Sequence, residues 1–128
     1  MLTVPKTQFY SLQKGALRNS LQQLGFGDLI IEADDGDFAE TAALVRSMDL
    51  IIMTDTAVAH IAGSLGQPVW NLVDYSPYWY FDADGACRWY PSMRLFRQSK
   101  PGDWRSVFER VQCELTALVE RQLGTILP

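Results

Sequence analysis

The sequence predicts one α/β domain with a doubly wound parallel sheet, spanning residues 1–128. Two patterns support this: short apolar segments alternate with helical patterns, and residues 49–54 hold four consecutive apolar residues. Alternating strands and helices are typical of parallel strands joined by right-handed crossovers. A strand that is apolar on both faces is typical of the centre of a covered sheet. We therefore expect residues 49–54 to form a central strand.

The bulk composition narrows the class of protein. A chain of 128 residues suits a single domain, and 48% hydrophobic with 20% charged residues is ordinary for a soluble globular protein. The net charge of −4 and the scattered Lys and Arg residues argue against a nucleic-acid surface, which needs a basic stripe. No run of about twenty apolar residues is present to span a membrane.

The two cysteines indicate a compartment. Cys87 and Cys113 are too few and too far apart for a disulfide framework or a zinc site. They suit a reducing environment, with Cys113 on the buried side of a helix. The N-terminus lacks a long apolar segment, so no secretory signal is expected. We expect a cytoplasmic protein.

The first third of the chain reads as strand, helix, strand and helix. Residues 9–13 are aromatic-rich and strand-like, residues 16–24 carry leucines at helical spacing, and residues 29–31 form a short apolar strand. An acidic turn follows at residues 34–37. Asp37 and Glu40 have the spacing of a capping box, which predicts that a helix begins at Phe38.

The remaining elements continue the alternation. A helix over 56–65 is ended by Gly66 and Pro68, and residues 68–73 form the next strand. Residues 74–91 lack a clear period and hold seven aromatic residues, so they form a long ordered loop. Residues 93–97 form an edge strand, and Asp103 caps a helix from 104 to about 123. The layout is Rossmann-like.

The most informative candidate site is the turn Asp55-Thr56-Ala57-Val58-Ala59-His60. Ligands of parallel sheets bind beyond the carboxyl ends of the strands, and a helix N-terminus attracts phosphate through its N–H groups and dipole. Ala57 and Ala59 are small enough for close approach, the Thr56 hydroxyl can add a hydrogen bond, and His60 lies one turn further on. The alternative is structural: Asp55 as an N-cap and His60 as a helix histidine.

Two other residues are candidates at the edges of such a site. Lys14 follows the first strand and can neutralise a phosphate, or it is a solvated turn lysine. Glu40 can accept hydrogen bonds from ribose hydroxyls, or it simply closes the capping box. Asp82 and Asp84 lack a third ligand nearby, so we interpret them as a turn and not as a metal site.

Other nucleotide motifs are absent. The dinucleotide fingerprint of spaced glycines and the P-loop pattern are both missing, which argues against NAD, FAD and P-loop ATPase chemistry. The aromatic loop suits sugar or base stacking as well as burial or an interface, and burial or an interface is the favoured interpretation.

The order of these segments resembles a known family. Residues 55–70, Asp-Thr-Ala-Val-Ala-His-Ile-Ala-Gly-Ser-Leu-Gly-Gln-Pro-Val-Trp, resemble the nucleotide-sugar motif of the heptosyltransferase family. The glycosyltransferase-like region that follows tetratricopeptide repeats in many bacterial proteins is more similar still. The matching segments are residues 9–15, 37–42, 89–98 and 102–104.

This resemblance implies one half of a GT-B fold, in which two Rossmann-like domains face each other without an obligatory metal. The C-terminal half binds the nucleoside-diphosphate sugar, and the N-terminal half supplies most acceptor contacts and usually the base. By resemblance, Thr56, Ala57 and His60 meet the diphosphate, Lys14 helps to neutralise it, and Glu40 lies near the ribose.

The chain departs from the family pattern at two places. Ala57 stands where heptosyltransferases usually have glycine, which hinders backbone approach to phosphate. Residues 78–81 read Tyr-Trp-Tyr-Phe where the tetratricopeptide-linked relatives tend to read Asp-Trp-Arg-Trp, which affects sugar recognition. The 128 residues also supply only one of the two GT-B domains.

The sequence therefore predicts the donor-binding domain of a glycosyltransferase, inactive alone, with a nucleotide sugar as substrate and no separate cofactor or metal. Its partner is a missing N-terminal GT-B domain or tetratricopeptide repeats, and an exposed apolar face can also form a homo-oligomer. The alternative is a non-catalytic nucleotide-binding or protein-interaction module. A weaker third possibility is a flavodoxin-like fold with an unrelated ligand.

Overall fold

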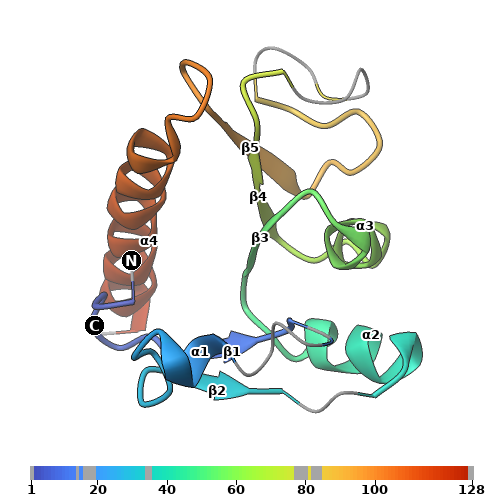
Figure 1. The fold of residues 1–128 in the computed structure, drawn as a ribbon, viewed down its shortest axis with the longest axis vertical. Helices are drawn as coiled ribbons and strands as arrows, with labels where there is room; N and C mark the ends of the chain where they lie inside the picture. Colours follow the sequence, from blue (N-terminus) through green and yellow to red (C-terminus); the bar gives the residue numbers. More distant parts are fainter. Residues whose placement is uncertain are drawn as a thin grey trace. The chain divides into compact units, whose positions relative to one another are not determined.

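A computed structural model describes residues 2–13, 15, 20–33, 36–76, 81 and 85–126 of the chain. Helices and strands alternate, and the named strands pair in parallel (Figure 1). The α/β, Rossmann-like fold class expected from the sequence is thereby confirmed. The chain divides into two compact units, which are described separately: residues 1–36 with 111–128, and residues 37–110.

The elements in order are β1 (Phe9–Ser11), α1 (Ser20–Gln23), β2 (Ile30–Glu32), α2 (Phe38–Arg46), β3 (Ile51–Thr54), α3 (Ala57–Ser64), β4 (Val69–Val73), β5 (Met93–Arg97) and α4 (Trp104–Ile126).

The first unit contains a two-stranded parallel sheet of β1 and β2. Tyr10 pairs with Ile31, so these two side chains share one face of the sheet. Both strands were expected, although β1 ends two residues earlier and β2 lies one residue later than the sequence suggested. Within the helix predicted at 16–24, the structure shows α1 over Ser20–Gln23, and residues 16–19 lie outside the described residues. Asp34 and Asp35, which belong to the predicted acidic turn, also lie outside them.

The second unit contains a three-stranded sheet with the order β3-β4-β5, in which β4 is central. All five residues of β4 are buried, whereas only Ile51 is buried in β3. The expectation that residues 49–54 form the central strand is therefore wrong for this sheet. An apolar sequence marks a covered strand but does not specify its neighbours, and β4 is covered even more completely.

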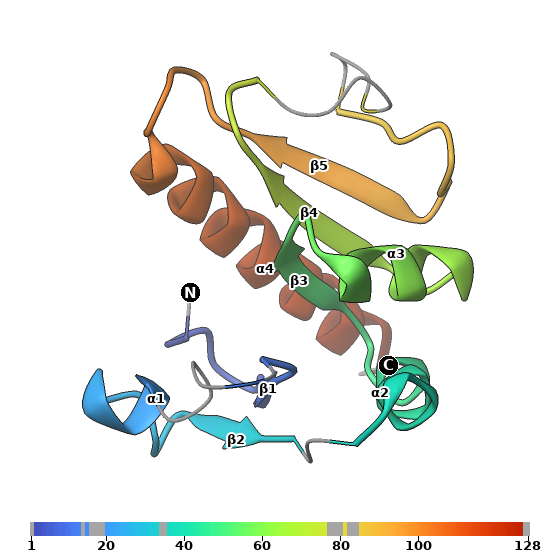
Figure 2. The ribbon, with the colours of Figure 1, turned by 45° about the vertical axis from the view of Figure 1, so that its right-hand side comes forward.

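Helices cover both faces of the three-stranded sheet. Figures 1 and 2 show α3 on one face and the first turns of α4 on the other, with α2 packed beside α3. The buried positions of α3 are Val58, Ala59, Ala62 and Gly63. The end of α3 is as predicted: Gly66 adopts a positive φ of 72°, and the N–H of Gln67 donates to the Ala62 carbonyl at 3.1 Å.

One prediction for α4 is wrong. Cys113 is exposed and not buried. The buried positions of this helix are Val107, Val111 and Leu115, which follow a four-residue spacing. Cys113 lies two residues from Val111 and therefore roughly 200° around the helix from it, because successive residues rotate by about 100°.

The long connection between β4 and β5 covers part of the outer edge of β5. Phe81 and Cys87 are both buried and form an isolated antiparallel bridge, and Ala86 pairs with Arg94. The N–H of Leu95 donates to the Gly85 carbonyl at 2.9 Å. These contacts pair backbone groups that an open strand edge leaves exposed. Residues 77–80 and the Asp82–Asp84 segment lie outside the described residues.

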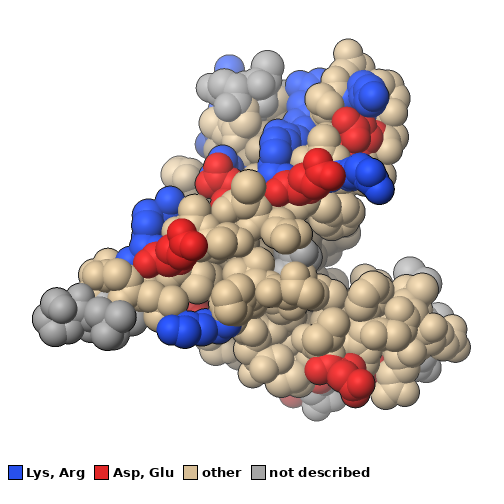
Figure 3. Space-filling view, turned by 90° about the vertical axis from the view of Figure 1, so that its left-hand side faces the viewer, with Lys and Arg blue, Asp and Glu red and all other residues tan. Residues whose placement is uncertain are grey.

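The surface carries charges of both signs. On the face shown in Figure 3, Lys and Arg side chains are interspersed with Asp and Glu side chains. In the described part of the chain, none of the helices combines the length and the apolar character needed to cross a membrane.

Side-chain caps begin two of the helices, as predicted. At α2, Asp37 Oδ1 accepts the N–H groups of Ala39 and Glu40 at 2.8 and 3.0 Å, and Glu40 Oε2 accepts the N–H of Asp37 at 3.1 Å. At α4, Asp103 Oδ1 accepts the N–H of Ser106 at 3.3 Å and Oδ2 accepts the Ser99 hydroxyl at 3.0 Å. The hydrogen bonds from Ser106, followed by that from Ser99, lower the pKa of Asp103.

The lowered pKa of Asp103 gives a prediction for acid stability. A carboxyl whose pKa is lower in the folded state stabilises the fold above its unfolded pKa, and this contribution is lost as the pH falls through the folded pKa. Asp103→Asn keeps a capping side chain but cannot ionise. The free energy of unfolding of the native chain should exceed that of Asp103→Asn at neutral pH, and the gap should close below about pH 4. Urea titrations across this pH range measure the gap, and a gap independent of pH would contradict the assignment.

Candidate functional site

The candidate site is the turn that joins β3 to α3. It follows the carboxyl end of β3, the edge at which parallel sheets bind ligands. Thr56 is the N-cap residue of α3, with extended φ and ψ of −139° and 170°. The interpretation of Asp55 as the N-cap is therefore wrong, because Asp55 lies one residue before the cap.

The N-terminus of α3 has no side-chain cap. The Thr56 side chain makes no capping hydrogen bond, and its hydroxyl instead lies 3.9 Å from Met53 Sδ. Thr56 and Ala57 are both exposed. The first N–H groups of a helix have no partner within the helix and carry part of the positive end of its dipole. An uncapped and exposed helix start of this kind offers those N–H groups to an anion.

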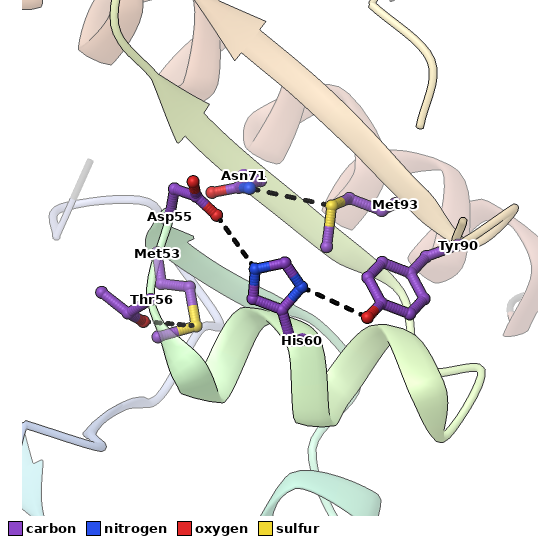
Figure 4. A network of polar contacts seen from close by, with 7 residues as sticks. All are labelled: Met53, Asp55, Thr56, His60, Asn71, Tyr90 and Met93. Atoms are coloured by element: carbon purple, nitrogen blue, oxygen red, sulfur yellow. Dashed lines mark hydrogen bonds and ion pairs between the residues drawn. The ribbon is translucent and has the colours of Figure 1, made fainter. Parts of the chain in front are cut away.

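His60 connects this turn to the aromatic loop. Its Nε2 lies 3.3 Å from Asp55 Oδ1, and its Nδ1 lies 3.2 Å from the Tyr90 hydroxyl oxygen (Figure 4). The His60 side chain is 37% exposed and that of Asp55 is 18% exposed. His60 is therefore a surface-accessible histidine of α3 that two neighbours hold, which also agrees with the structural alternative of a helix histidine.

Tyr90 packs directly on α3. Its ring meets the His60 ring edge to face, with centroids 5.6 Å apart and planes at 67°. It also covers Gly63, where an added Cβ would lie 2.5 Å from Tyr90 Cγ and 3.0 Å from its Cβ. The shorter of these distances is one that real Cβ atoms essentially never show. The absence of a side chain at position 63 is what lets Tyr90 approach the helix.

Sequence reasoning missed the role of Tyr90. It placed Tyr90 among the loop aromatics and favoured burial or an interface for them. The available signal was the helical glycine three residues after His60, since a glycine inside a helix often marks a close approach. The pattern gave no indication of which aromatic residue fills that space.

A buried amide lies on β4, in register with Met53 of β3. Asn71 is fully buried on β4, and its Nδ2 donates weakly to Met93 Sδ at 3.7 Å (Figure 4). Its Oδ1 has no hydrogen-bond partner among the described residues. Asn71 was not predicted as a site residue, because a single Asn within an apolar strand carries no recognisable pattern.

The structure brings together only some of the predicted residues. Asp55, Thr56, Ala57 and His60 share the β3–α3 turn and the first turns of α3. Glu40 lies on α2, a different helix, where it completes the capping box. Lys14 lies outside the described residues. No group of three His, Cys, Asp or Glu side chains with metal-site geometry occurs among the residues that the structure describes.

The Gly63–Tyr90 contact gives a prediction for stability. Gly63→Ala gains about 1 kcal/mol of helix propensity, but the new methyl overlaps the Tyr90 ring, and overpacking costs roughly 1–3 kcal/mol. We expect a net loss of up to about 2 kcal/mol in the free energy of unfolding. Gly124→Ala is the matched control, since Gly124 is also helical and its added Cβ would meet nothing within 4 Å. Urea denaturation of both variants tests this, and equal effects would contradict the close packing.

The chain is similar in sequence to a known bacterial protein. The chain is 30% identical over 121 residues to "Protein FlbA" of Caulobacter vibrioides. The similarity covers 90% of this chain and 20% of FlbA, so the chain spans about a fifth of the length of that relative. No protein-family model matches the chain, and no solved structure matches it.

Proposed function

We propose that the chain is the donor-binding domain of a glycosyltransferase and that it binds a nucleoside-diphosphate sugar at the Asp55–His60 turn. The observation that carries the proposal is the exposed, uncapped N-terminus of α3 with the half-exposed His60 beside it. The resemblance of residues 55–70 to the nucleotide-sugar motif of heptosyltransferases supplies the substrate class. The parallel α/β fold is compatible with this role.

The chemistry expected of the turn is electrostatic. Transfer of a sugar leaves negative charge on the departing nucleoside diphosphate, and donors aimed at that charge stabilise the transition state. In our proposal the N–H groups at the start of α3 and the Thr56 hydroxyl serve as these donors, and the His60 Nε2–H offsets the charge of Asp55 beside them. By resemblance, Lys14 adds a positive charge and Glu40 contacts the ribose.

The negative charge of Asp55 opposes anion binding at this turn. Its carboxylate lies near the positive end of α3, where a phosphate would also bind, and like charges in proximity are unfavourable. His60 lies beside the same carboxylate, so its Nε2–H is the group best placed to reduce that repulsion. His60 is therefore the side chain on which anion binding should depend most.

The remaining parts of the proposal concern partners. The acceptor contacts and the catalytic base are assigned to a second domain, either an N-terminal GT-B domain or one linked to tetratricopeptide repeats. We propose a cytoplasmic location. Self-association through exposed apolar residues is a further part of the proposal.

A second candidate function is a non-catalytic nucleotide-binding or protein-interaction module. The exposed indole of Trp89 favours it, because this side chain is 63% exposed next to the Tyr90 contact. Exposed large aromatic residues are enriched at protein interfaces. Nucleotide binding without transfer in the presence of its partner domain would support this second function.

Titration with UDP, ADP and GDP tests the binding site. We expect at least one of them to bind, and we expect His60→Ala to weaken binding by about tenfold or more, the loss typical of a charge-assisted hydrogen bond. Thr56→Val should weaken it less. Ser64→Ala, at the other end of α3, is the control and should bind as the native chain does. Calorimetry measures these affinities, and the absence of binding to all three nucleotides would refute the donor-site proposal.

A transfer assay tests the division of labour between domains. The isolated 128-residue chain should show no sugar transfer from UDP-, ADP- or GDP-sugars, since the base and acceptor contacts are assigned to another domain. Product formation is measured with radiolabelled donors, and donor hydrolysis is followed in parallel. Robust transfer by the purified chain would overturn this part of the proposal.

A further inference from the structure

The two polar contacts of His60 favour one tautomer of its ring. A carboxylate only accepts hydrogen bonds, so the nitrogen that faces Asp55 Oδ1 is the one expected to bear hydrogen, and this is Nε2. In that tautomer of the neutral ring Nδ1 is an acceptor, and the Tyr90 hydroxyl oxygen, 3.2 Å away, is placed to donate to it. The chain of contacts runs from Tyr90 through His60 to Asp55 (Figure 4).

The same contacts define the orientation of the ring. Rotating the imidazole by 180° about its bond to Cβ would place carbon atoms where Nδ1 and Nε2 now lie. Both polar contacts would then be lost. The contact with Asp55 alone would hold the ring only weakly, since the distance from Asp55 Oδ1 to Nε2 is long at 3.3 Å. The Tyr90 hydroxyl supplies the second point that fixes the ring.

Tyr90 is itself held in place by packing. Its ring fills the space left by Gly63, and its carbonyl accepts the N–H of Met93 at 2.9 Å at the start of β5. Tyr90 is thus held by the helix through its ring and by the start of β5 through its backbone carbonyl. A tyrosine fixed at both points can hold an imidazole more firmly than a flexible surface side chain.

We propose that Tyr90 is a positioning residue, which orients the His60 imidazole so that Nε2–H faces Asp55 at the start of α3, and that the space at Gly63 accommodates the Tyr90 ring. Tyr90 acts through His60 and makes no contact with the ligand itself. The role in ligand binding rests on the proposed function, whereas the role in orienting His60 does not. The experiment below separates the two.

The chain contains a single histidine, which makes the ring directly observable. In the ¹⁵N spectrum of the ligand-free full chain, at a pH where the ring is neutral, Nε2 should have the shift of a protonated nitrogen. Nδ1 should have that of a hydrogen-bonded acceptor. In Tyr90→Phe, which keeps the ring on Gly63, the Nδ1 signal should move toward the position of an unbonded nitrogen.

Two further variants test the route of this effect. Gly63→Ala should move the Nδ1 signal in the same direction although the tyrosine is intact, because its methyl displaces the Tyr90 ring. Tyr10→Phe removes an exposed phenol hydroxyl in the first unit and should leave both signals unchanged. An unchanged Nδ1 signal in a folded Tyr90→Phe variant would overturn the proposal, whatever Gly63→Ala shows.

Nucleotide titration then tests the link to binding. Tyr90→Phe should weaken the affinity for the best of UDP, ADP and GDP by about threefold to tenfold, the effect of one neutral hydrogen bond. Tyr10→Phe should have no effect. Unchanged affinity together with a shifted Nδ1 signal would refute the role in binding but not the orienting role. If the native chain binds no nucleotide, the donor-site proposal fails, and the ligand-free spectra still decide the role of Tyr90.

Discussion

A strand that is buried at every residue must be covered on both faces and paired along both edges, and β4 imposes this constraint on the second unit. The flanking strands β3 and β5 satisfy its backbone groups, and α3 and the first turns of α4 cover its side chains. Because β3 and β4 are parallel, the chain must cross the sheet between them, and α3 is that crossover. The start of α3 therefore lies at the carboxyl end of β3, and the candidate site is a result of this topology.

The site itself combines features that oppose each other in charge. The start of α3 attracts anions, while Asp55 places a carboxylate next to it. His60 lies between the two and interacts with the carboxylate through one nitrogen and with a neutral phenol through the other. The imidazole thereby links the carboxylate at the turn to the loop that carries Tyr90. Because of this link, a substitution at Tyr90 in the loop is expected to change the orientation of His60 at the turn.

Much of the fold follows from local patterns in the sequence. The Asp37 capping box, the Asp103 cap and the Gly66 stop each depend on a few adjacent residues, and each was predicted correctly. The central position of β4 was missed, because strand order depends on pairing between distant segments. Cys113 was misplaced because its side of α4 depends on which stripe meets the core. For the site, the turn was found from its sequence, but the contact of Tyr90 with His60 joins positions thirty residues apart, and no local pattern encodes it.

The fit of Tyr90 over Gly63 has a consequence for how the sequence can change over time. A methyl at position 63 already overlaps the ring at position 90, so position 63 cannot take a larger residue while that ring stays in place. The two positions are expected to covary: a larger residue in the helix requires a smaller one in the loop, and with the smaller residue the hydroxyl that faces His60 is lost. Relatives that keep glycine and tyrosine together are therefore those expected to keep the histidine in the same orientation.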